Sequence, residues 1–238
     1  MIDELRTRFN GLMDIDHIRE KVTIRPKPVD NVDKLPPMLA AHLLELTLKQ
    51  IYIPNQFSLE LISEVIGKAA LHSAMRSESE QVFINSWYYP TPAETFPICL
   101  TGLAGVGKSA TIDALLRIMP GPTDIKTNHC VTAHTAESYW YASARGKASG
   151  KQLLTDFLGT EVTSRENASV LKSRAQMHAN KLGISLAVLE EMQHLTPGKG
   201  VALTTDILLT MTGLGLPMVY VANFSLGHKL LKRNQEDT

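Results

Sequence analysis

The chain has 238 residues, of which 44% are hydrophobic and 20% are charged. A sequence of this length and composition can bury one hydrophobic core together with a small accessory subdomain. Its 24 basic and 24 acidic residues give a formal net charge of zero, which excludes a positive field over the whole surface. Any binding to DNA must therefore come from a local basic patch.

The sequence carries no sign of a membrane or of an oxidising compartment. No apolar run approaches the ~20 residues of a membrane span, and the start at Met1–Glu4 does not resemble a signal peptide. Cys99 and Cys130 form neither a C-x-x-C motif nor a disulfide framework. We therefore expect a cytoplasmic protein that has no membrane partner.

The first 97 residues divide into two parts. Residues 1–34 are polar and charged and contain the helix-breaking run Arg25–Pro28, so we expect a polar N-terminal arm that is either mobile or docked on a partner. Residues 35–97 are expected to form a helical segment that leads into the core, with helices over 39–51 and 58–76.

The end of this segment, residues 83–97, holds Trp87, two adjacent tyrosines and three prolines. This composition favours a loop before the first core strand. The aromatic side chains would either anchor the loop to the core or contact an adenine ring.

Residues 102–109 match the phosphate-binding loop pattern G-x-x-x-x-G-K-[ST] at every fixed position. The apolar run 98–101 predicts a buried strand before the loop, and the periodic run 109–119 predicts a helix after it. In such a loop backbone N–H groups face a phosphate, Lys108 reaches the β- and γ-phosphates, and Ser109 binds Mg²⁺. A glycine-rich turn with a chance lysine is the alternative. The residues that we expect to bind ATP are Gly102, Leu103, Ala104, Gly105, Val106, Gly107, Lys108, Ser109 and Ala110.

A second apolar run, 184–189, predicts a strand that ends at Glu190 and Glu191. In phosphate-loop enzymes such a strand supplies one carboxylate that helps to hold Mg²⁺ and another that orients or deprotonates the attacking water. We assign Glu190 to the metal, together with Ser109, and Glu191 to catalysis, together with Lys108. Glu190 replaces the usual aspartate, and its extra methylene shifts the metal-side oxygen by ~1.5 Å, so we expect slow hydrolysis. A surface pair of glutamates that merely ends a strand is the alternative.

A third strand is predicted over 218–222, and Asn223 follows it. A polar residue at such a strand tip can hydrogen-bond the γ-phosphate or the attacking water, which is the catalytic role called sensor 1 in AAA+ ATPases. An asparagine after a strand is by itself only a turn signal. Because Asn223 follows the other two motifs in order, we assign it the sensor role.

These motifs resemble those of the AAA+ regulators of DNA transposition, the TnsC/TniB type. The resemblance rests on the loop at 102–109, on Leu186–Leu195 with its Glu-Glu-Met-Gln-His-Leu run, and on Pro217–Asn223, whose last residue stands where relatives often carry threonine. Upstream, Leu35–Pro37 and Tyr52–Pro54, followed by a helix, are similar to the segment that precedes the core in those proteins.

The resemblance covers residues 35–233 and implies an α/β phosphate-loop core of the AAA+ kind at 98–238, with a mostly parallel sheet flanked by helices. It implies a protein that binds ATP and Mg²⁺, assembles with copies of itself into rings or filaments on double-stranded DNA, and links a target-selection protein to a transposase. Complete AAA+ modules continue into a helical lid, whereas this chain ends fifteen residues after Asn223. We therefore expect the lid to be absent.

The local basic patch is expected after the β-prone run 138–143. Arg145, Lys147 and Lys151 follow it on a Gly/Ser-rich loop without an acidic residue. Such cations can contact successive phosphates of a duplex without reading its sequence; a solvated loop is the alternative. The resemblance assigns to Lys147 the place of a lysine that tracks the DNA backbone in TnsC-like proteins, with Lys199 as a weaker candidate.

Three functions compete at this point. The first is an ATP-dependent transposition regulator that assembles on DNA. The second is a phosphate-loop enzyme acting on a small molecule, such as a kinase, which would need further acid–base residues that the sequence does not reveal. The third is an interaction module that keeps ATP as a structural switch with little hydrolysis, as Glu190 and the missing lid would favour.

Overall fold

The computed structural model of the chain describes residues 2–91, 95–128, 134–147, 149–159, 167–192, 200–224 and 226, without the side chains of 200–203. In chain order the elements are α1 (Ile2–Thr7), α2 (Ile15–Val22), the 3₁₀ turn η1 (Val32–Lys34), α3 (Pro37–Gln50), α4 (Gln56–Arg76), α5 (Glu80–Tyr88), β1 (Ile98–Gly102), α6 (Lys108–Ile118), β2 (Thr123–Ile125), β3 (His134–Ala136), β4 (Tyr139–Ser143), α7 (Gly150–Leu158), α8 (Ala168–Leu182), β5 (Leu186–Glu190), α9 (Gly200–Thr212) and β6 (Met218–Asn223).

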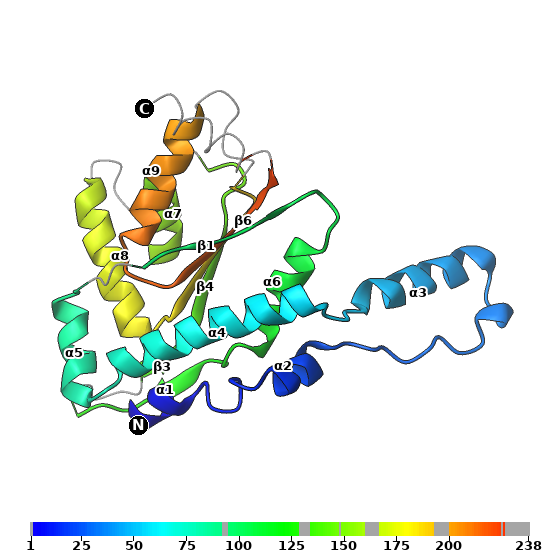
Figure 1. Cartoon of the computed structure of the whole chain (residues 1–238), viewed down its shortest axis with the longest axis horizontal. Helices are drawn as coiled ribbons and strands as arrows, with labels where there is room; N and C mark the ends of the chain where they lie inside the picture. The colour runs from blue at the N-terminus through cyan, green and yellow to red at the C-terminus, as the bar shows by residue number, and fades with distance from the viewer. Residues whose placement is uncertain are drawn as a thin grey trace.

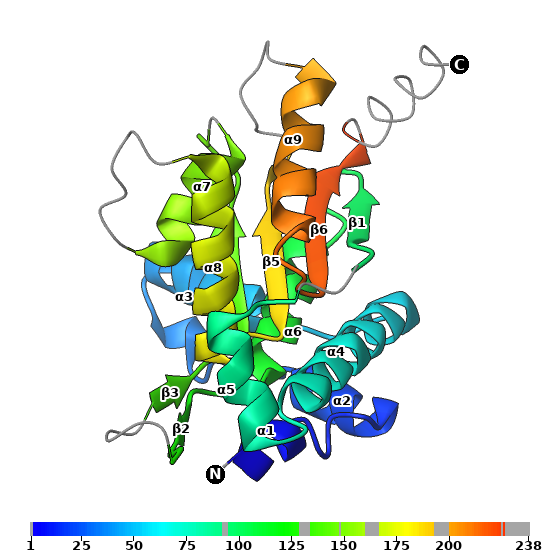
Figure 2. The ribbon, with the colours of Figure 1, turned by 90° about the vertical axis from the view of Figure 1, so that its left-hand side faces the viewer.

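A four-stranded parallel sheet in the order β1-β6-β5-β4 forms the centre of the molecule. Helices cover both of its faces, with α6 on one side and α7, α8 and α9 on the other (Figures 1 and 2). The short strands β2 and β3 form a separate antiparallel pair. The expected α/β fold, with a mostly parallel sheet between helices and a helical segment before it, is confirmed at this level. The expectation about a lid concerns residues after Leu226, which lie outside the described part.

The sheet separates two hydrophobic core clusters, and β5 contributes to both of them. Leu186 and Val188 pack with α2, α4 and α6, whereas Ala187 and Leu189 pack with α7, α8 and α9. This division follows from the alternation of side chains along a strand. All residues of β5 are buried, as expected of a central parallel strand covered on both faces.

The N-terminal residues are not a polar arm over their whole length. Residues 2–22 contain α1, α2 and the segment between them, and they bury Leu5, Phe9 and Ile18 against the body of the molecule. Arg8 ties this segment to the core because its Nη2 donates to the Gly183 carbonyl at 2.6 Å. The apolar residues of this segment are three to five positions apart, and the charged residues between them made the segment look polar in the sequence.

Residues 80–88 form the helix α5, so the prediction of a loop from residue 83 was wrong for this part. Ser79 caps the helix by accepting a hydrogen bond from the Val82 N–H at 3.2 Å. Phe83 and Trp87, one helical turn apart, make an edge-to-face contact with ring centroids 5.3 Å apart. Trp87 is only 6% exposed, in agreement with the core-anchoring interpretation of this residue.

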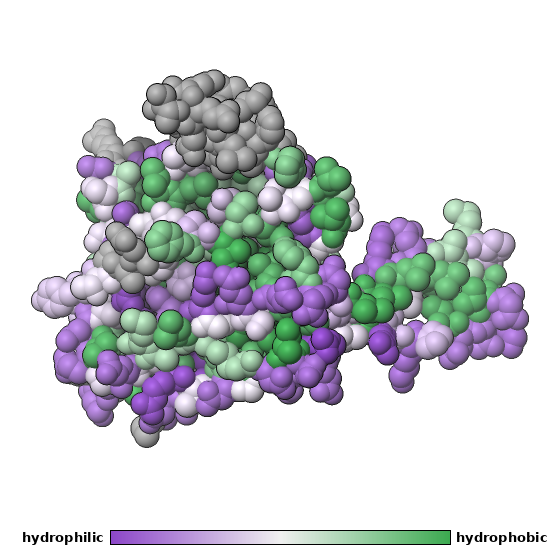
Figure 3. Space-filling view, viewed as in Figure 1, coloured by the Kyte–Doolittle hydropathy of each residue, from purple (hydrophilic) through white to green (hydrophobic). Residues whose placement is uncertain are grey.

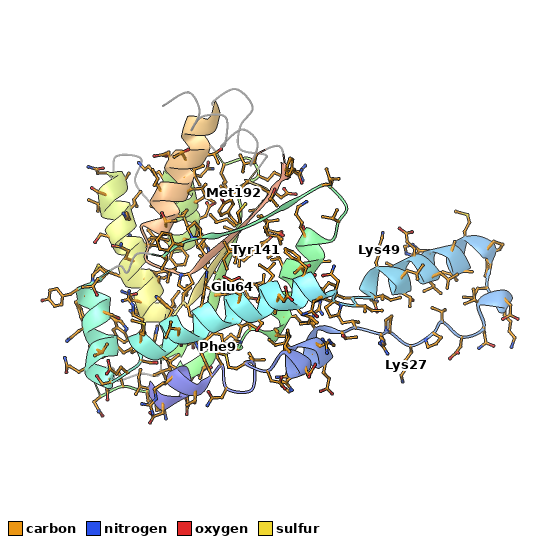
Figure 4. The ribbon with its side chains drawn as sticks, in the orientation of Figure 1. Phe9, Lys27, Lys49, Glu64, Tyr141 and Met192 are labelled. Atoms are coloured by element: carbon orange, nitrogen blue, oxygen red, sulfur yellow. The ribbon has the colours of Figure 1, made fainter. Side chains whose placement is uncertain are left out.

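An arm formed by residues 24–51 projects from the body, and helix α3 makes up half of its residues (Figure 1). Its base is closed by backbone hydrogen bonds between Ile24 and Tyr52, at 2.8 and 3.2 Å. Lys27 and Lys49 lie on its two legs (Figure 4). Apolar side chains run along the arm in Figure 3. The exposed large ones are Met38, Leu39, Leu44, Leu46, Leu48 and Ile51.

His72, in α4, makes the stability of the fold depend on pH. Burial of its ring, assisted by the charge of Arg76, lowers the pKa of His72 from 6.5 to about 4. The folded-state pKa lies below the unfolded value, so the unfolded state binds more protons between the two values. Stability is therefore complete above the unfolded pKa and falls as the pH drops toward the folded one.

We expect the free energy of unfolding to fall by about 2 kcal/mol between neutral pH and about pH 5 on account of this residue. Urea unfolding at the two pH values measures the change. The variant His72→Leu, which cannot titrate at this position, should lose about that much less. An equal pH dependence of the two proteins would contradict the assignment.

Among the residues that the structure describes, no helix is both long enough and apolar enough to cross a membrane.

Candidate functional site

The ends of three neighbouring strands meet at one edge of the sheet, because all strands are parallel. Asn223 at the end of β6 pairs in register with Gly102 at the end of β1. On the other side, Glu190 at the end of β5 pairs with Ser143 at the end of β4. The phosphate-loop sequence and the Glu190–Glu191 pair therefore lie at the same sheet edge, with the tip of β6 between their strands. This is the edge at which open α/β sheets bind ligands.

The alternation of side chains also decides which face of the sheet each of these residues occupies. Val188 of β5 and Val221 of β6 belong to the core cluster under α6, as does Leu100 of β1. Glu190 stands two residues after Val188, and Asn223 stands two residues after Val221. They therefore share the face that carries α6. The metal and sensor candidates are thus placed on the side of the sheet where the phosphate loop leads into its helix.

The loop between β1 and α6 has the backbone that a phosphate-binding loop requires. Gly105 and Gly107 have φ angles of 81° and 87°, a left-handed conformation that side-chain-bearing residues rarely adopt. Helix α6 begins immediately afterwards at Lys108. The N–H groups of its first turn have no partner within the helix and attract anions.

Lys108 reaches back over the loop rather than into solvent. Its Nζ donates to the carbonyls of Gly102 at 3.0 Å and Leu103 at 2.7 Å. Ser109, the hydroxyl candidate for Mg²⁺, is exposed at the start of α6. Thr111 helps to fix this turn because its hydroxyl donates to the Gly107 carbonyl at 3.1 Å. A cationic group and a hydroxyl are therefore held beside the first N–H groups of the helix.

Glu190 is a buried carboxylate with one oxygen still unused. The residue is 7% exposed, and its Oε2 accepts a hydrogen bond from the Tyr141 hydroxyl at 2.8 Å. Its Oε1 is buried and has no hydrogen-bond partner. Such an atom is costly to leave without a partner. Burial, the hydrogen bond to Glu190 and nearby negative charges raise the pKa of Tyr141 to about 12, so this hydroxyl remains a donor at physiological pH.

Glu191 differs from Glu190 in conformation and exposure. Its φ is 56°, in the left-handed region that strains a residue with a side chain by roughly 1–2 kcal/mol. Its carboxylate is partly exposed, and Oε2 lies 3.9 Å from Nε of Arg145. Strain of this kind concentrates at functional sites. The chain therefore turns sharply between the two glutamates and presents them to different surroundings.

The basic loop after β4 has acidic neighbours in space, although its own sequence contains none. Lys147 forms an ion pair with Asp156 of α7, and Arg145 lies near Glu191. Lys151 lies in the first turn of α7, whose N-terminus adds to the attraction for phosphate. Lys199 lies outside the described residues. The structure thus places the exposed Arg145 near the catalytic candidate Glu191.

Sequence reasoning missed Tyr141 and Asp156, the acidic partner of Lys147. The signal for Tyr141 was the pairing of β4 with β5, since Tyr141 stands two residues before the position that pairs with Glu190. Residues offset by two on neighbouring strands lie on the same face and within reach of long side chains. Without the strand order, nothing in the sequence joins residues 49 positions apart.

No protein-family model matches this chain, and no curated protein matches it.

Proposed function

We propose that this protein is an ATP-dependent regulator of DNA transposition of the AAA+ kind, which binds ATP with Mg²⁺ and assembles with copies of itself on double-stranded DNA. The observation that carries the proposal is the left-handed glycine loop between β1 and α6, placed at the same sheet edge as the buried Glu190. The motif sequence supports ATP as the nucleotide. The resemblance to TnsC/TniB-type regulators supports the link to a transposase and to a target-selection protein.

The donor set at this edge fits a magnesium ion. Mg²⁺ prefers oxygen ligands and is usually held by one or two protein groups, with phosphate oxygens and waters completing the octahedron. Ser109 and Glu190 would hold it, and the unpartnered Oε1 of Glu190 is an atom that such an ion or its water would satisfy. When bound, the ion supplies charge neutralisation for the phosphates.

The remaining residues divide the work of hydrolysis. Lys108 exchanges the carbonyls of Gly102 and Leu103 for oxygens of the β- and γ-phosphates, because a phosphate is the stronger acceptor for its charge. Glu191 orients the attacking water and accepts its proton. Asn223, at the tip of β6 between the two motifs, hydrogen-bonds the γ-phosphate or this water.

Self-assembly is supported by the composition of the surface. The arm exposes six large apolar side chains on and next to one short helix, and monomeric proteins rarely leave a contiguous apolar patch larger than a few hundred Å² uncovered. Copies of a chain with zero net charge do not repel each other at long range. We propose a second copy as the partner of this arm.

The switch-module alternative keeps one observation in its favour. Arg145 lies 3.9 Å from Glu191, so the side chain that would orient the attacking water is instead engaged with a cation. A chain whose hydrolysis stays negligible even on DNA would therefore be an ATP-binding switch rather than an ATPase.

The proposed function is tested by assembly and by duplex binding together. Light scattering is expected to rise when ATP, Mg²⁺ and duplex DNA are all present, and not with any one of them alone. Replacing Arg145, Lys147 and Lys151 by glutamine should weaken binding about equally for two unrelated duplexes. It should also lower the slope of log K against log salt by roughly 0.9 for each lost phosphate contact. Fluorescence anisotropy at several salt concentrations measures both quantities.

The ion pair between Lys147 and Asp156 provides a matched control. Asp156→Asn removes the competing carboxylate and keeps the side-chain shape, so it should strengthen duplex binding while the triple variant weakens it. ATP affinity should be unchanged in both variants. If neither the affinity nor the salt slope changes, the loop is merely solvated and the DNA part of the proposal fails.

A further inference from the structure

Tyr141 and Glu190 are joined across two neighbouring strands by the parallel pairing of β4 with β5. Tyr141 pairs with Val188, and Ser143 pairs with Glu190, so Tyr141 and Glu190 are diagonal neighbours on the face that carries α6. The distance between the tyrosine hydroxyl and Oε2 of the glutamate is 2.8 Å. Figure 4 labels Tyr141 near the middle of the molecule, among the strands of the sheet.

The contact with Tyr141 restricts the orientation of the Glu190 carboxylate at the end of β5. A glutamate has one more rotatable bond than an aspartate, so holding its carboxylate in one orientation loses more side-chain entropy. The hydrogen bond to Oε2 fixes the rotation of the carboxylate, and this directs which oxygen remains available. The available oxygen is Oε1, which is buried without a partner.

We propose that Tyr141 is the positioning residue for Glu190: its hydroxyl holds Oε2 so that Oε1 is presented to the divalent cation that accompanies the nucleotide. The inference rests on the proposed function, since it assumes a nucleotide site at this sheet edge. The inference goes beyond the proposed function because it assigns a role to Tyr141, a residue that lies outside the nucleotide-binding motif. Outer partners of this kind orient metal ligands, and their loss typically weakens metal binding by about 10- to 100-fold.

The side chain of Tyr141 meets the requirements of this role. A tyrosine hydroxyl is a hydrogen-bond donor at neutral pH, so it donates to the carboxylate at 2.8 Å rather than repelling it. Tyr141 as a residue is 43% exposed, so water can replace part of the lost hydrogen bond when the hydroxyl is removed. We therefore expect an effect near the lower end of that range.

The test is the magnesium dependence of ATP binding, measured with a fluorescent ATP analogue. In Tyr141→Phe the Mg²⁺ concentration for half-maximal binding should rise about tenfold, whereas nucleotide binding in the presence of a chelator should not change. Tyr139→Phe is the matched control, because it removes a hydroxyl from the same face of the same strand, two residues away. It should behave as the parent chain. Thermal unfolding of each variant checks that the fold is retained.

A double-mutant cycle shows whether the hydroxyl acts through Glu190. In a Glu190→Gln background the tenfold effect of Tyr141→Phe should disappear, since the ligand that it positions has been changed. An unaltered magnesium dependence in Tyr141→Phe, or a tenfold effect that persists in the Glu190→Gln background, overturns the inference while ATP binding by the parent chain still stands. If the parent chain binds no nucleotide, the proposed function fails, and this inference fails with it.

Discussion

Lys108→Ala is expected to abolish measurable ATP binding while leaving the fold intact. Lys108 is the cation of the phosphate loop, and its Nζ already lies within hydrogen-bond distance of two loop carbonyls. Each hydrogen bond from a charged donor is worth roughly 1.5–3 kcal/mol, so the loss of two phosphate contacts should weaken binding by at least about 10²-fold. Isothermal titration calorimetry measures the affinity directly.

The matched control is Lys126→Ala, which removes an exposed lysine just after β2, outside the loop. This variant should bind ATP as the parent does. Both variants should unfold at the same temperature without nucleotide, because the carbonyls that Lys108 leaves can bond to water. Only the parent and the control should gain stability from ATP, by about 2.7 kcal/mol at a ligand concentration of 100 times Kd. Equal affinity of all three chains would remove the basis of the nucleotide site.

Glu191→Gln is expected to slow ATP hydrolysis by on the order of 10²-fold, with ATP binding retained, because glutamine keeps the shape of the side chain but cannot accept the proton. The change also removes the interaction with Arg145, whose Nε lies 3.9 Å from the carboxylate. This interaction is exposed, so its loss should change the stability of the fold very little. Single-turnover hydrolysis, with and without duplex DNA, measures the rate.

The left-handed backbone of Glu191 offers a second variant that separates stability from catalysis. At a φ of 56° glycine is unstrained, so Glu191→Gly should unfold no more easily than the parent and should gain up to about 1 kcal/mol. It should nevertheless lose hydrolysis as Glu191→Gln does. Parental rates in both variants would show that Glu191 is not the base. If the parent chain itself hydrolyses no ATP even with duplex DNA, the switch-module alternative is preferred.

The parts of the fold that could be predicted from sequence are those with strong local signals. The strands β1 and β6 and the helices α4 and α6 were each marked by an apolar period and by a glycine, proline or polar residue at the end. The helix α5 was missed because Tyr88, Tyr89 and the prolines after them outweighed the apolar pair Phe83 and Trp87. The two aromatic side chains stabilise the helix by packing against α1 and β2, which are distant in the sequence.

The candidate site shows the same limit. Lys108 and Ser109 follow from a contiguous motif, and Glu190, Glu191 and Asn223 follow from the ends of apolar runs. Their placement at one sheet edge then depends on the strand order β1-β6-β5-β4. The assignment of roles to Glu190 and Glu191 remains a prediction, although their burial and backbone conformation differ in the way that two roles would require.

The phosphate-loop motif can be recognised without any structure, because glycine and lysine at fixed spacing specify a local backbone and a local charge that need no distant partner. The contacts of Tyr141 with Glu190, of Arg145 with Glu191 and of Lys147 with Asp156 emerge only from the folded arrangement. These contacts join different elements, and their energies depend on which strands and helices become neighbours. Strand order and helix packing are set by burial of the whole core, and no local pattern of residues contains that information.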